Sequence, residues 1–570
     1  MTGAKFRSST SPQRVGKIIA MTQNRTGGRI LVDNLVAQGC DRMFHVPGES
    51  FLAVLDALHD VPEIDVVTCR QEGGVTFMAC ADGAMTGRPG VAFVTRGPGA
   101  TNASIGVHVA MQDSVPMILF IGDIDRGTRD REAFQEIDLP AMFKPIAKWA
   151  SRIEDPKRIP EYVARAYATA MGGRPGPVVL AIPEDMLTEV AEAIDRPRVE
   201  RPVQDADIEM ALKARAALAA AKAPVAIIGG AYWDKGAAAD VQAFAEQFGI
   251  PLVAAFRRQD AVANDCAVYA GNLGYGPNPK LVERVRAADV VLVLGARLGE
   301  ATTDGYTLIT PEHPGQTLIH VHPDANELNR SYRTDIAICG DPGQFAKAMI
   351  AQTSAVPTHP GGAAAHADYL AWSTPKPREG VALDLGQCVL AMREAMPADT
   401  IICNGAGNFS GWWHRYWRYA AMPSQLAPTA GAMGYGTPAA VAAALRFPDR
   451  QVVAVAGDGD FMMNGQELAT AIQHNANLLV IIVDNGAYGT IRMHQEREYP
   501  ARISGTGLHN PDFAALARAY GAWAETVERT EAFAPALARA QAERGVRLLH
   551  LKTDVEVISA GTTITALRAR

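Results

Sequence analysis

Short apolar segments alternate with amphipathic ones along most of the chain. Runs such as "GVAFVT", "PMILFIG", "DVVLVLG" and "QVVAVAG" have the length and composition of buried strands. Between such runs lie stretches like "MNGQELATAIQHN", which have the apolar spacing and the Glu and Gln content of helices. Because strands and helices take turns almost throughout, the sequence predicts an α/β protein with parallel sheets.

The alternating pattern divides into three blocks, each about the size of one domain. Residues 27–190 form the first block, 200–353 the second and 381–570 the third. The segment 354–380 is rich in Pro, Gly and Ala, which predicts a linker. Residues 1–26 are polar and basic, which predicts a flexible tail ahead of the first domain.

The composition is that of an ordinary globular protein. Of 570 residues, 48% are hydrophobic and 20% are charged, and the net charge of -7 argues against nucleic acid or an anionic membrane as the main partner. No run approaches the roughly 18 apolar residues of a membrane helix. The seven cysteines are scattered without a C-x-x-C pair, which predicts free thiols and a cytoplasmic location.

Two oxygen-bearing side chains follow neighbouring apolar strands of the third block. Asp458 comes after "QVVAVAG", and Asn485 comes after "NLLVIIVD". Because the carboxyl ends of parallel strands meet at one edge of a sheet, both side chains are expected there, where α/β proteins bind ligands. Carboxylate and amide oxygens suit Mg²⁺ or Ca²⁺. Gly457 and Gly459 allow close approach of a phosphate, and a helix is expected to begin near Gly465.

The sequence G-D-G followed by an Asn about 27 residues later resembles the thiamin-diphosphate motif of the transketolase and acetolactate synthase class. The resemblance implies that Asp458, Asn485 and the carbonyl of Ala487 bind the Mg²⁺ that anchors the cofactor's diphosphate. Members of the family usually have Asn where this chain has Asp484.

A second segment, "RQEGG...ADGAMTGRPGVAFVTRGPGATN", resembles the pyrimidine-binding domain of the acetolactate synthase family. The match implies that Glu72 is the glutamate that bonds to the pyrimidine N1′ and favours the tautomer able to deprotonate C2 of the thiazolium. "APTAGAMGYG" resembles the segment that supports the bent cofactor, with Met433 as its bulky apolar residue. "ICNGAGNFSGWW" resembles a loop at the diphosphate, which Asn408 is expected to contact.

The resemblance extends over about residues 27 to 555 and implies three Rossmann-like domains: pyrimidine-binding, central and diphosphate-binding. In this family the two domains that share one cofactor come from different subunits, so a homodimer or homotetramer is implied. The central domain resembles one that holds FAD in anabolic acetolactate synthases, and Arg297 matches a flavin contact. A purely structural role for this domain stays equally open.

The family relationship implies decarboxylation of a 2-oxo acid, a transferase or lyase reaction. "AFQEID" resembles the acetolactate synthase stretch in which Phe134 and Gln135 would face the active site, which favours carboligation to a second carbonyl compound. Glu49 lies where decarboxylases of the family place an acidic, proton-handling residue, so a non-ligating 2-oxo acid decarboxylase or C–C lyase is the alternative. His494 is a candidate carboxylate ligand or acid. Arg96, where a small residue is usual, suits an acidic or bulky polar substrate.

Two other classes of protein are disfavoured. A nicotinamide dehydrogenase lacks the required G-x-G-x-x-G followed by an acidic residue. A non-catalytic relative has no need of Glu72, Asp458 and Asn485 together. Glu49 and His494 as plain solvent-facing side chains remain the alternative to their catalytic roles.

Overall fold

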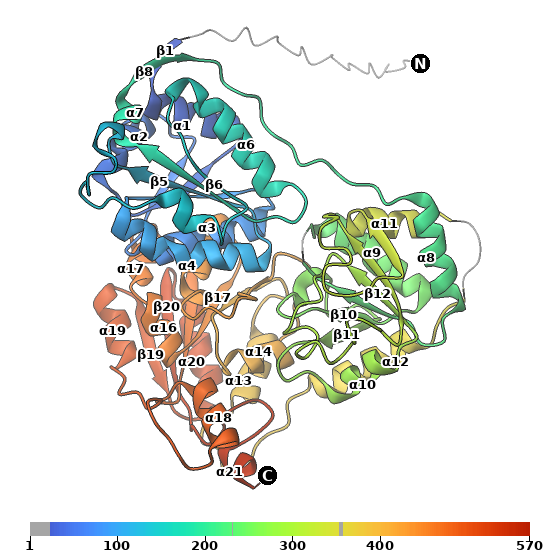
Figure 1. Cartoon of the computed structure of the whole chain (residues 1–570). Helices are drawn as coiled ribbons and strands as arrows, with labels where there is room; N and C mark the ends of the chain where they lie inside the picture. The colour runs from blue at the N-terminus through green and yellow to red at the C-terminus, as the bar shows by residue number, and fades with distance from the viewer. Residues whose placement is uncertain (1–22, 231, 353–356, 570) are drawn as a thin grey trace, which may run out of the picture.

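The computed structural model describes residues 23–230, 232–352 and 357–569, which form three successive α/β domains (Figure 1). Each domain has a six-stranded parallel sheet with helices packed against it. The predicted fold class is confirmed. No helix in the described ranges has both the length and the apolar character needed to cross a membrane.

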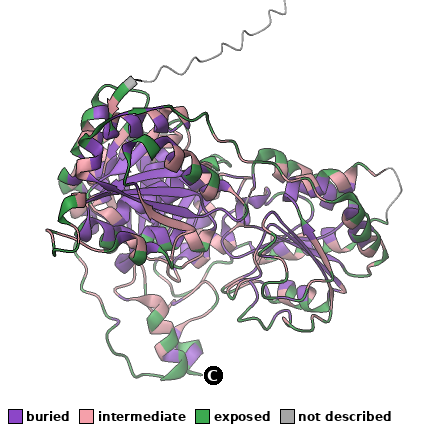
Figure 2. Ribbon diagram, turned by 45° about the horizontal axis from the view of Figure 1, so that its top comes forward, coloured by how far each residue is buried: buried purple, intermediate pink, exposed green. Residues whose placement is uncertain are grey.

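The first sheet has the strand order β3-β2-β4-β5-β7-β6. Its middle strands are buried along their whole length, which explains their unbroken apolar sequences (Figure 2). The elements of this domain are β2 (Arg42–His45), β3 (Asp65–Thr68), β4 (Gly90–Val94), β5 (Met117–Asp123), β6 (Trp149–Arg152), β7 (Pro177–Pro183), α1 (Gly27–Ala37), α2 (Leu52–His59), α3 (Glu72–Thr86), α4 (Gly97–Asp113), α5 (Leu139–Phe143), α6 (Ile159–Met171) and α7 (Glu184–Thr188).

The second sheet has the order β11-β10-β9-β12-β13-β14 and stands to one side of the other two domains (Figure 1). Its elements are β9 (Val225–Ile228), β10 (Leu252–Ala254), β11 (Tyr269–Asn272), β12 (Val290–Leu294), β13 (Thr317–His322), β14 (Ile336–Cys339), α8 (Ile208–Ala220), α9 (Lys235–Phe248), α10 (Pro279–Ala287), α11 (Pro342–Ile350) and α12 (Gly361–Trp372).

The third sheet has the order β16-β15-β17-β18-β20-β19. Its elements are β15 (Ile401–Asn404), β16 (Gln425–Leu426), β17 (Val452–Gly457), β18 (Leu478–Asp484), β19 (Trp523–Val527), β20 (Val546–Lys552), α13 (Leu385–Ala395), α14 (Ser410–Tyr416), α15 (Gly436–Arg446), α16 (Asp458–Asn464), α17 (Glu467–Gln473), α18 (Gly489–Glu498), α19 (Phe513–Tyr520), α20 (Thr530–Ala542) and α21 (Ile564–Arg568).

Two expectations about the connecting segments need correction. Residues 1–22 of the predicted tail 1–26 lie outside the described residues. The last four residues of that segment are not a tail, because they form β1 (Gln23–Thr26), which pairs antiparallel with β8 (Val190–Ala193). The predicted linker 354–380 contains α12, whose Tyr369 ring packs edge-on against Tyr269 of β11. Its alanines are strong helix formers, so a composition typical of linkers here belongs to a packed helix.

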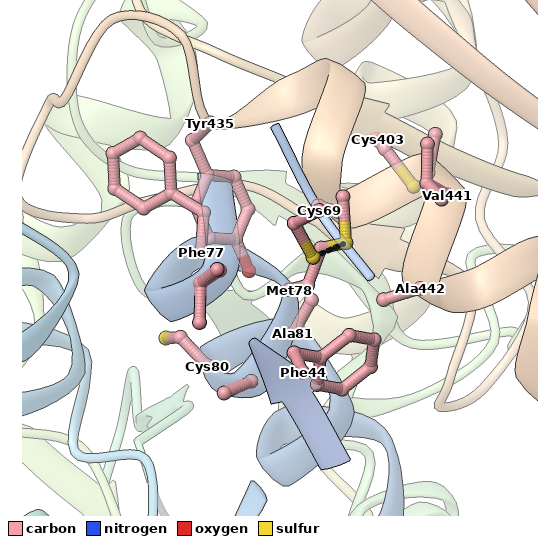
Figure 3. Packing of buried hydrophobic residues seen from close by; sticks show 14 of the residues in the cluster. Phe44, Cys69, Phe77, Met78, Cys80, Ala81, Cys403, Tyr435, Val441 and Ala442 are labelled. Atoms are coloured by element: carbon pink, nitrogen blue, oxygen red, sulfur yellow. Dashed lines mark hydrogen bonds between the residues drawn. The ribbon is translucent and has the colours of Figure 1, made fainter. Parts of the chain in front are cut away.

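The first and third domains of the chain share one hydrophobic core. Helices α3 and α15 pack side by side, and Phe77 meets Tyr435 edge-on with ring centroids 5.4 Å apart (Figure 3). At the end of α15, Arg446 bonds to the buried Asp82 at 2.9 Å and to Asp41 at 2.6 Å. The relative placement of the two domains is therefore set by apolar packing and a partly buried ion-pair network.

Candidate active site

A cavity of about 250 Å³ opens at the carboxyl edge of the third sheet. Its walls come from the loops after β15, β17 and β18, from the loop before α15 and from the C-terminal segment. Seven of the predicted site residues line it: Asn408, Met433, Gly457, Asp458, Gly459, Asn485 and Ala487. Residues from four separate stretches of sequence thus meet where the alternating pattern placed a ligand site.

Asp458 lies at this edge because β17 and β18 pair with Gly457 opposite Val483. Its side chain is 3% exposed. One carboxylate oxygen accepts from the Gly459 amide at 2.9 Å, and the other accepts from Asn510 Nδ2 at 2.8 Å. Burial, together with the nearby Asp484, raises the pKa of Asp458. A cation at this carboxylate would compensate the buried charge.

Asp484, the carboxylate beside Asp458, stays charged at neutral pH. Although burial alone would raise its pKa, hydrogen bonds from His550 at 2.8 Å and from Asn510 at 2.7 Å hold the pKa of Asp484 well below its usual range. Asn510 therefore bridges Asp458 and Asp484. No pattern in the sequence indicated Asn510, because only the tertiary fold brings its loop to the sheet edge.

Asn485 and Ala487 complete a set of oxygen donors. The Asn485 side-chain oxygen accepts from the Ala487 amide at 3.1 Å, and Gly486 between them has a φ of +66°. An isolated antiparallel bridge between Ala487 and Gly507 fixes the backbone of this turn. A carboxylate, an amide oxygen and a backbone carbonyl are the hard donors that Mg²⁺ prefers, so these residues fit the expected metal.

Two glycines of the same wall make room for aromatic rings that line the cavity. A Cβ at Gly459 would lie 2.5 Å from the Tyr488 ring, and one at Gly457 would lie 2.8 Å from the Phe409 ring. The helix expected to begin near Gly465 is present as α17, which begins at Glu467, and a further helix, α16, precedes it and begins at Asp458 itself. The helical segment is interrupted between Asn464 and Glu467.

Asp460 joins the two loops that carry the predicted cofactor contacts Asn408 and Met433. Its buried Oδ1 accepts from the amide of Ala406 at 3.1 Å and from that of Gly434 at 2.9 Å. These loops carry Asn408 and Met433. Asp460 was missed by the sequence analysis, although it stands two residues from Asp458 in "GDGDF".

Asn408 is tied to the surrounding protein. Its Nδ2 donates to the Ile558 carbonyl at 3.0 Å, and its Oδ1 accepts from Thr490 Oγ1 at 3.0 Å. Met433 lines the cavity as a half-buried side chain. The geometry is compatible with both predicted cofactor contacts.

Glu72 lies elsewhere, at the carboxyl edge of the first sheet. It is the first residue of α3, directly after the β3–α3 turn. Its Oε2 accepts from Asn102 Nδ2 at 3.0 Å, and the small Gly99 of α4 leaves space beside Oε1. The shared core of α3 and α15 holds this part of the first domain against the third domain of the same chain, so Glu72 does not enter that chain's own cavity.

Glu49, Phe134 and Gln135 gather at the same edge around Arg96. The buried Arg96 guanidinium pairs with Glu49 at 3.1 Å and with Glu184 at 3.0 Å, and its Nε donates to the Phe134 carbonyl at 3.2 Å. Gln135 has a φ of +65° where its backbone passes Gly97. The expectation that Arg96 presents its charge to a substrate is wrong, because two carboxylates already bind it.

His494 is exposed on α18 and is not among the residues that line the cavity, although Gly489, Thr490 and Ile491 of the same helix are. The contacts within one chain therefore do not support its predicted catalytic role.

A second cavity of about 370 Å³ lies in the central domain, where it meets α4. It adjoins a further cavity of about 260 Å³, and both are lined by Gln112, Arg297, Gly299 and Glu300. Arg297 donates to the Gln112 carbonyl at 2.9 Å, and burial lowers its pKa to about 10, which leaves it charged at neutral pH. A half-buried guanidinium beside these cavities is a group that pairs with anionic ligands.

Family models match all three domains. The thiamine pyrophosphate enzyme N-terminal TPP binding domain matches residues 25–142, the central domain matches 212–349 and the C-terminal TPP binding domain matches 405–551. The chain therefore belongs to the thiamin-diphosphate-dependent enzymes, in the family that includes the acetolactate synthase large subunits.

Curated relatives extend over nearly the whole chain. The acetolactate synthase large subunit of Parasynechococcus marenigrum is 31% identical over 521 residues, which are 88% of this chain and 83% of the relative. The isozyme 2 large subunit of Escherichia coli is 29% identical over 533 residues, 93% of this chain and 95% of the relative. The large subunit of Corynebacterium glutamicum is 28% identical over 538 residues, 92% and 86% of the two chains.

Proposed function

We propose that the protein catalyses the thiamin-diphosphate- and Mg²⁺-dependent decarboxylation of a 2-oxo acid, followed by carboligation of the remaining fragment to a second carbonyl compound. The observation that carries this proposal is the cavity at the third sheet, where Asp458, Asn485 and Ala487 offer oxygen ligands. The similarity to acetolactate synthase large subunits supports the carboligation step.

The predicted site residues have distinct tasks in this proposal. Asp458, Asn485 and the Ala487 carbonyl would hold Mg²⁺ and with it the diphosphate of the cofactor. Met433 would support the bend between the two cofactor rings. When bound, thiamin diphosphate supplies a carbon acid whose conjugate base adds to the substrate carbonyl and accepts the electrons released with CO₂. Glu72 would hold a proton at the pyrimidine N1′.

The separation of Glu72 from the cavity of its own chain supports a homodimer or homotetramer. In such an assembly the first domain of one subunit covers the third-domain cavity of its partner. Exposed apolar side chains flank both halves of the site: Ile105 on α4, 41% exposed, and Met462 and Met463 on α16, 53% and 47% exposed. A partner subunit that covers these side chains would remove apolar surface from water.

Glu49 supports the alternative function, a non-ligating 2-oxo acid decarboxylase or C–C lyase. Arg96 holds its carboxylate at the edge of the first sheet where Phe134 and Gln135 also lie. An acid that handles protons there would favour release of an aldehyde, as in a 2-oxo acid decarboxylase or related C–C lyase. Phe134, 72% exposed, favours contact with a substrate or a partner chain instead.

NMR analysis of the products separates the two functions. The protein is incubated with thiamin diphosphate and Mg²⁺ and with pyruvate, 2-oxobutyrate, glyoxylate or an aromatic 2-oxo acid, alone or with a second carbonyl compound. A 2-hydroxy-2-acyl acid from pyruvate supports carboligation. Aldehyde alone supports the decarboxylase. Absence of turnover with every substrate, in protein that binds the cofactor, counts against both.

Two further features remain proposals. FAD is one candidate occupant of the central-domain cavity, and extraction of the purified protein followed by flavin absorbance would test it. A cytoplasmic location agrees with the seven free cysteines, six of which are buried.

A further inference from the structure

The turn that precedes Glu72 is held by a side chain of the third domain. Glu467, the first residue of α17, is 0% exposed. Its Oε1 accepts from the Gln71 amide at 3.0 Å, and its two oxygens lie 3.2 and 3.3 Å from the Arg70 amide. Thr470 Oγ1 donates to Oε2 at 2.5 Å. One buried carboxylate thus binds two successive backbone N–H groups immediately before Glu72.

The surroundings accommodate this carboxylate closely. A Cβ at Gly74 would lie 2.5 Å from Glu467 Oε1, so the glycine leaves the space that the oxygen occupies. The same end of the third domain binds the turn twice more. His474 Nε2 accepts from the Thr68 amide at 3.1 Å, and Gln473 accepts from the Arg70 guanidinium at 2.5 Å.

A carboxylate is a costly group in this position. Burial raises the pKa of Glu467, and the donors from Thr470, Arg70 and Gln71 offset only part of that effect. An apolar side chain would pack the domain boundary without this desolvation cost. The carboxylate differs from such a side chain in one respect: it defines where two particular N–H groups, and hence the first residue of α3, must lie.

We propose that Glu467 is a positioning residue that fixes the Arg70–Gln71 backbone and thereby aims the Glu72 carboxylate at the aminopyrimidine ring of the cofactor. This inference rests on the proposed function, in which Glu72 activates thiamin diphosphate. Activation requires the Glu72 oxygen within hydrogen-bond reach of N1′, so a displacement of a few tenths of an ångström at the start of α3 weakens it.

Glu467→Gln tests the inference with little change in volume. The amide retains one acceptor oxygen but turns an N–H₂ group toward a backbone donor. In the cofactor-free protein, hydrogen exchange of the Arg70 and Gln71 amides is expected to accelerate. With thiamin diphosphate and Mg²⁺ bound, exchange of the cofactor's C2 proton, followed by NMR, is expected to slow ~10-fold or more. Affinity for the cofactor is expected to stay the same, because Glu467 does not line the cavity.

Asp260 provides a matched control at a different domain boundary. It is a buried carboxylate that accepts from the amides of Ser424 at 3.1 Å and Gln425 at 3.0 Å. Asp260→Asn makes the same chemical change far along the chain from Glu72. It is expected to alter stability to a similar degree and to leave the C2 exchange rate unchanged.

A wild-type C2 exchange rate in Glu467→Gln, alongside a slow rate in Glu72→Gln, would overturn the positioning role and leave the proposed function standing. A wild-type rate in Glu72→Gln as well would refute the proposed function and the inference together. The double variant is expected to be no slower than Glu72→Gln alone, and an additive loss would contradict action through Glu72. If Glu467→Gln fails to fold, Gly74→Ala displaces the same carboxylate, and unchanged C2 exchange there is equally decisive.

Discussion

Gly459→Ala probes how closely the cavity wall is packed. Gly459 is the second residue of α16, between Asp458 and Asp460. A Cβ there would lie 2.5 Å from Cε1 and 2.9 Å from Cδ1 of Tyr488, which lines the cavity, and 3.3 Å from Leu508 Cδ1. Real Cβ contacts are not this short, so the half-buried Tyr488 ring has to move.

Two opposing effects set the size of the response. Overpacking of this kind costs about 1–3 kcal/mol. Replacement of Gly by Ala within a helix recovers about 1 kcal/mol. The net loss of unfolding free energy is therefore about 0–2 kcal/mol. If thiamin diphosphate binds only when the displaced Tyr488 ring returns to its original position, and that return costs about 1–2 kcal/mol, the affinity for the cofactor falls ~5–30-fold.

Isothermal titration of thiamin diphosphate in the presence of Mg²⁺, together with urea unfolding, measures both quantities. Gly411→Ala in α14 is the matched control, because a Cβ there meets no atom within 4 Å. It is expected to leave affinity unchanged and to raise stability slightly. Unchanged cofactor affinity in Gly459→Ala would refute the assignment of this wall to the diphosphate site.

Three further changes have expected outcomes. Asp458→Asn should stabilise the metal-free protein, because it removes a buried charge beside Asp484, and should abolish Mg²⁺-dependent cofactor binding; thermal unfolding with and without Mg²⁺ measures both. Arg446→Gln leaves the buried Asp82 without its cation and should cost about 3–5 kcal/mol in urea unfolding. Burial lowers the pKa of His320 to about 4. The unfolded chain therefore binds the proton first, and stability present above pH 6.5 is lost toward pH 4, by about 3 kcal/mol for this residue.

Each of these three expectations has its own check. Unaltered Mg²⁺ dependence in Asp458→Asn would exclude the carboxylate as a metal ligand. Asp41→Asn removes the exposed partner of Arg446 and should cost under about 1 kcal/mol, so an equal loss in both variants would show that burial of Asp82 is not the cause. His320→Gln should flatten the acid dependence of stability, and an unchanged slope would assign that dependence to other groups.

Much of the fold followed from local pattern. The parallel α/β architecture was predictable because buried strands have unbroken apolar runs and the helices between them have their own period. Asp458 and Asn485 were predictable for the same reason: each follows a strand directly, and neighbouring parallel strands end at one edge. The helix α12 was missed because its alanine-rich sequence resembles a linker in composition.

Other features depend on partners that are distant in sequence. Asn510 reaches Asp458 only through a loop that follows α18. Arg96 suggested a substrate-binding cation, but the folded chain surrounds it with Glu49 and Glu184. Glu467 stands in a stretch that the sequence predicts as helical, but only the packing of the first domain brings the Gln71 amide to its carboxylate.

The sequence by itself therefore determined the strands, the helices and the sheet edge at which the chemistry-bearing residues stand, because these follow from backbone geometry over a few residues. Tertiary structure alone decided which carboxylates are buried, which are paired and which face a ligand. Charges interact through space, so the properties of Asp458, Arg96 and Glu467 were set only when strand register and domain packing brought their partners within about 3 Å.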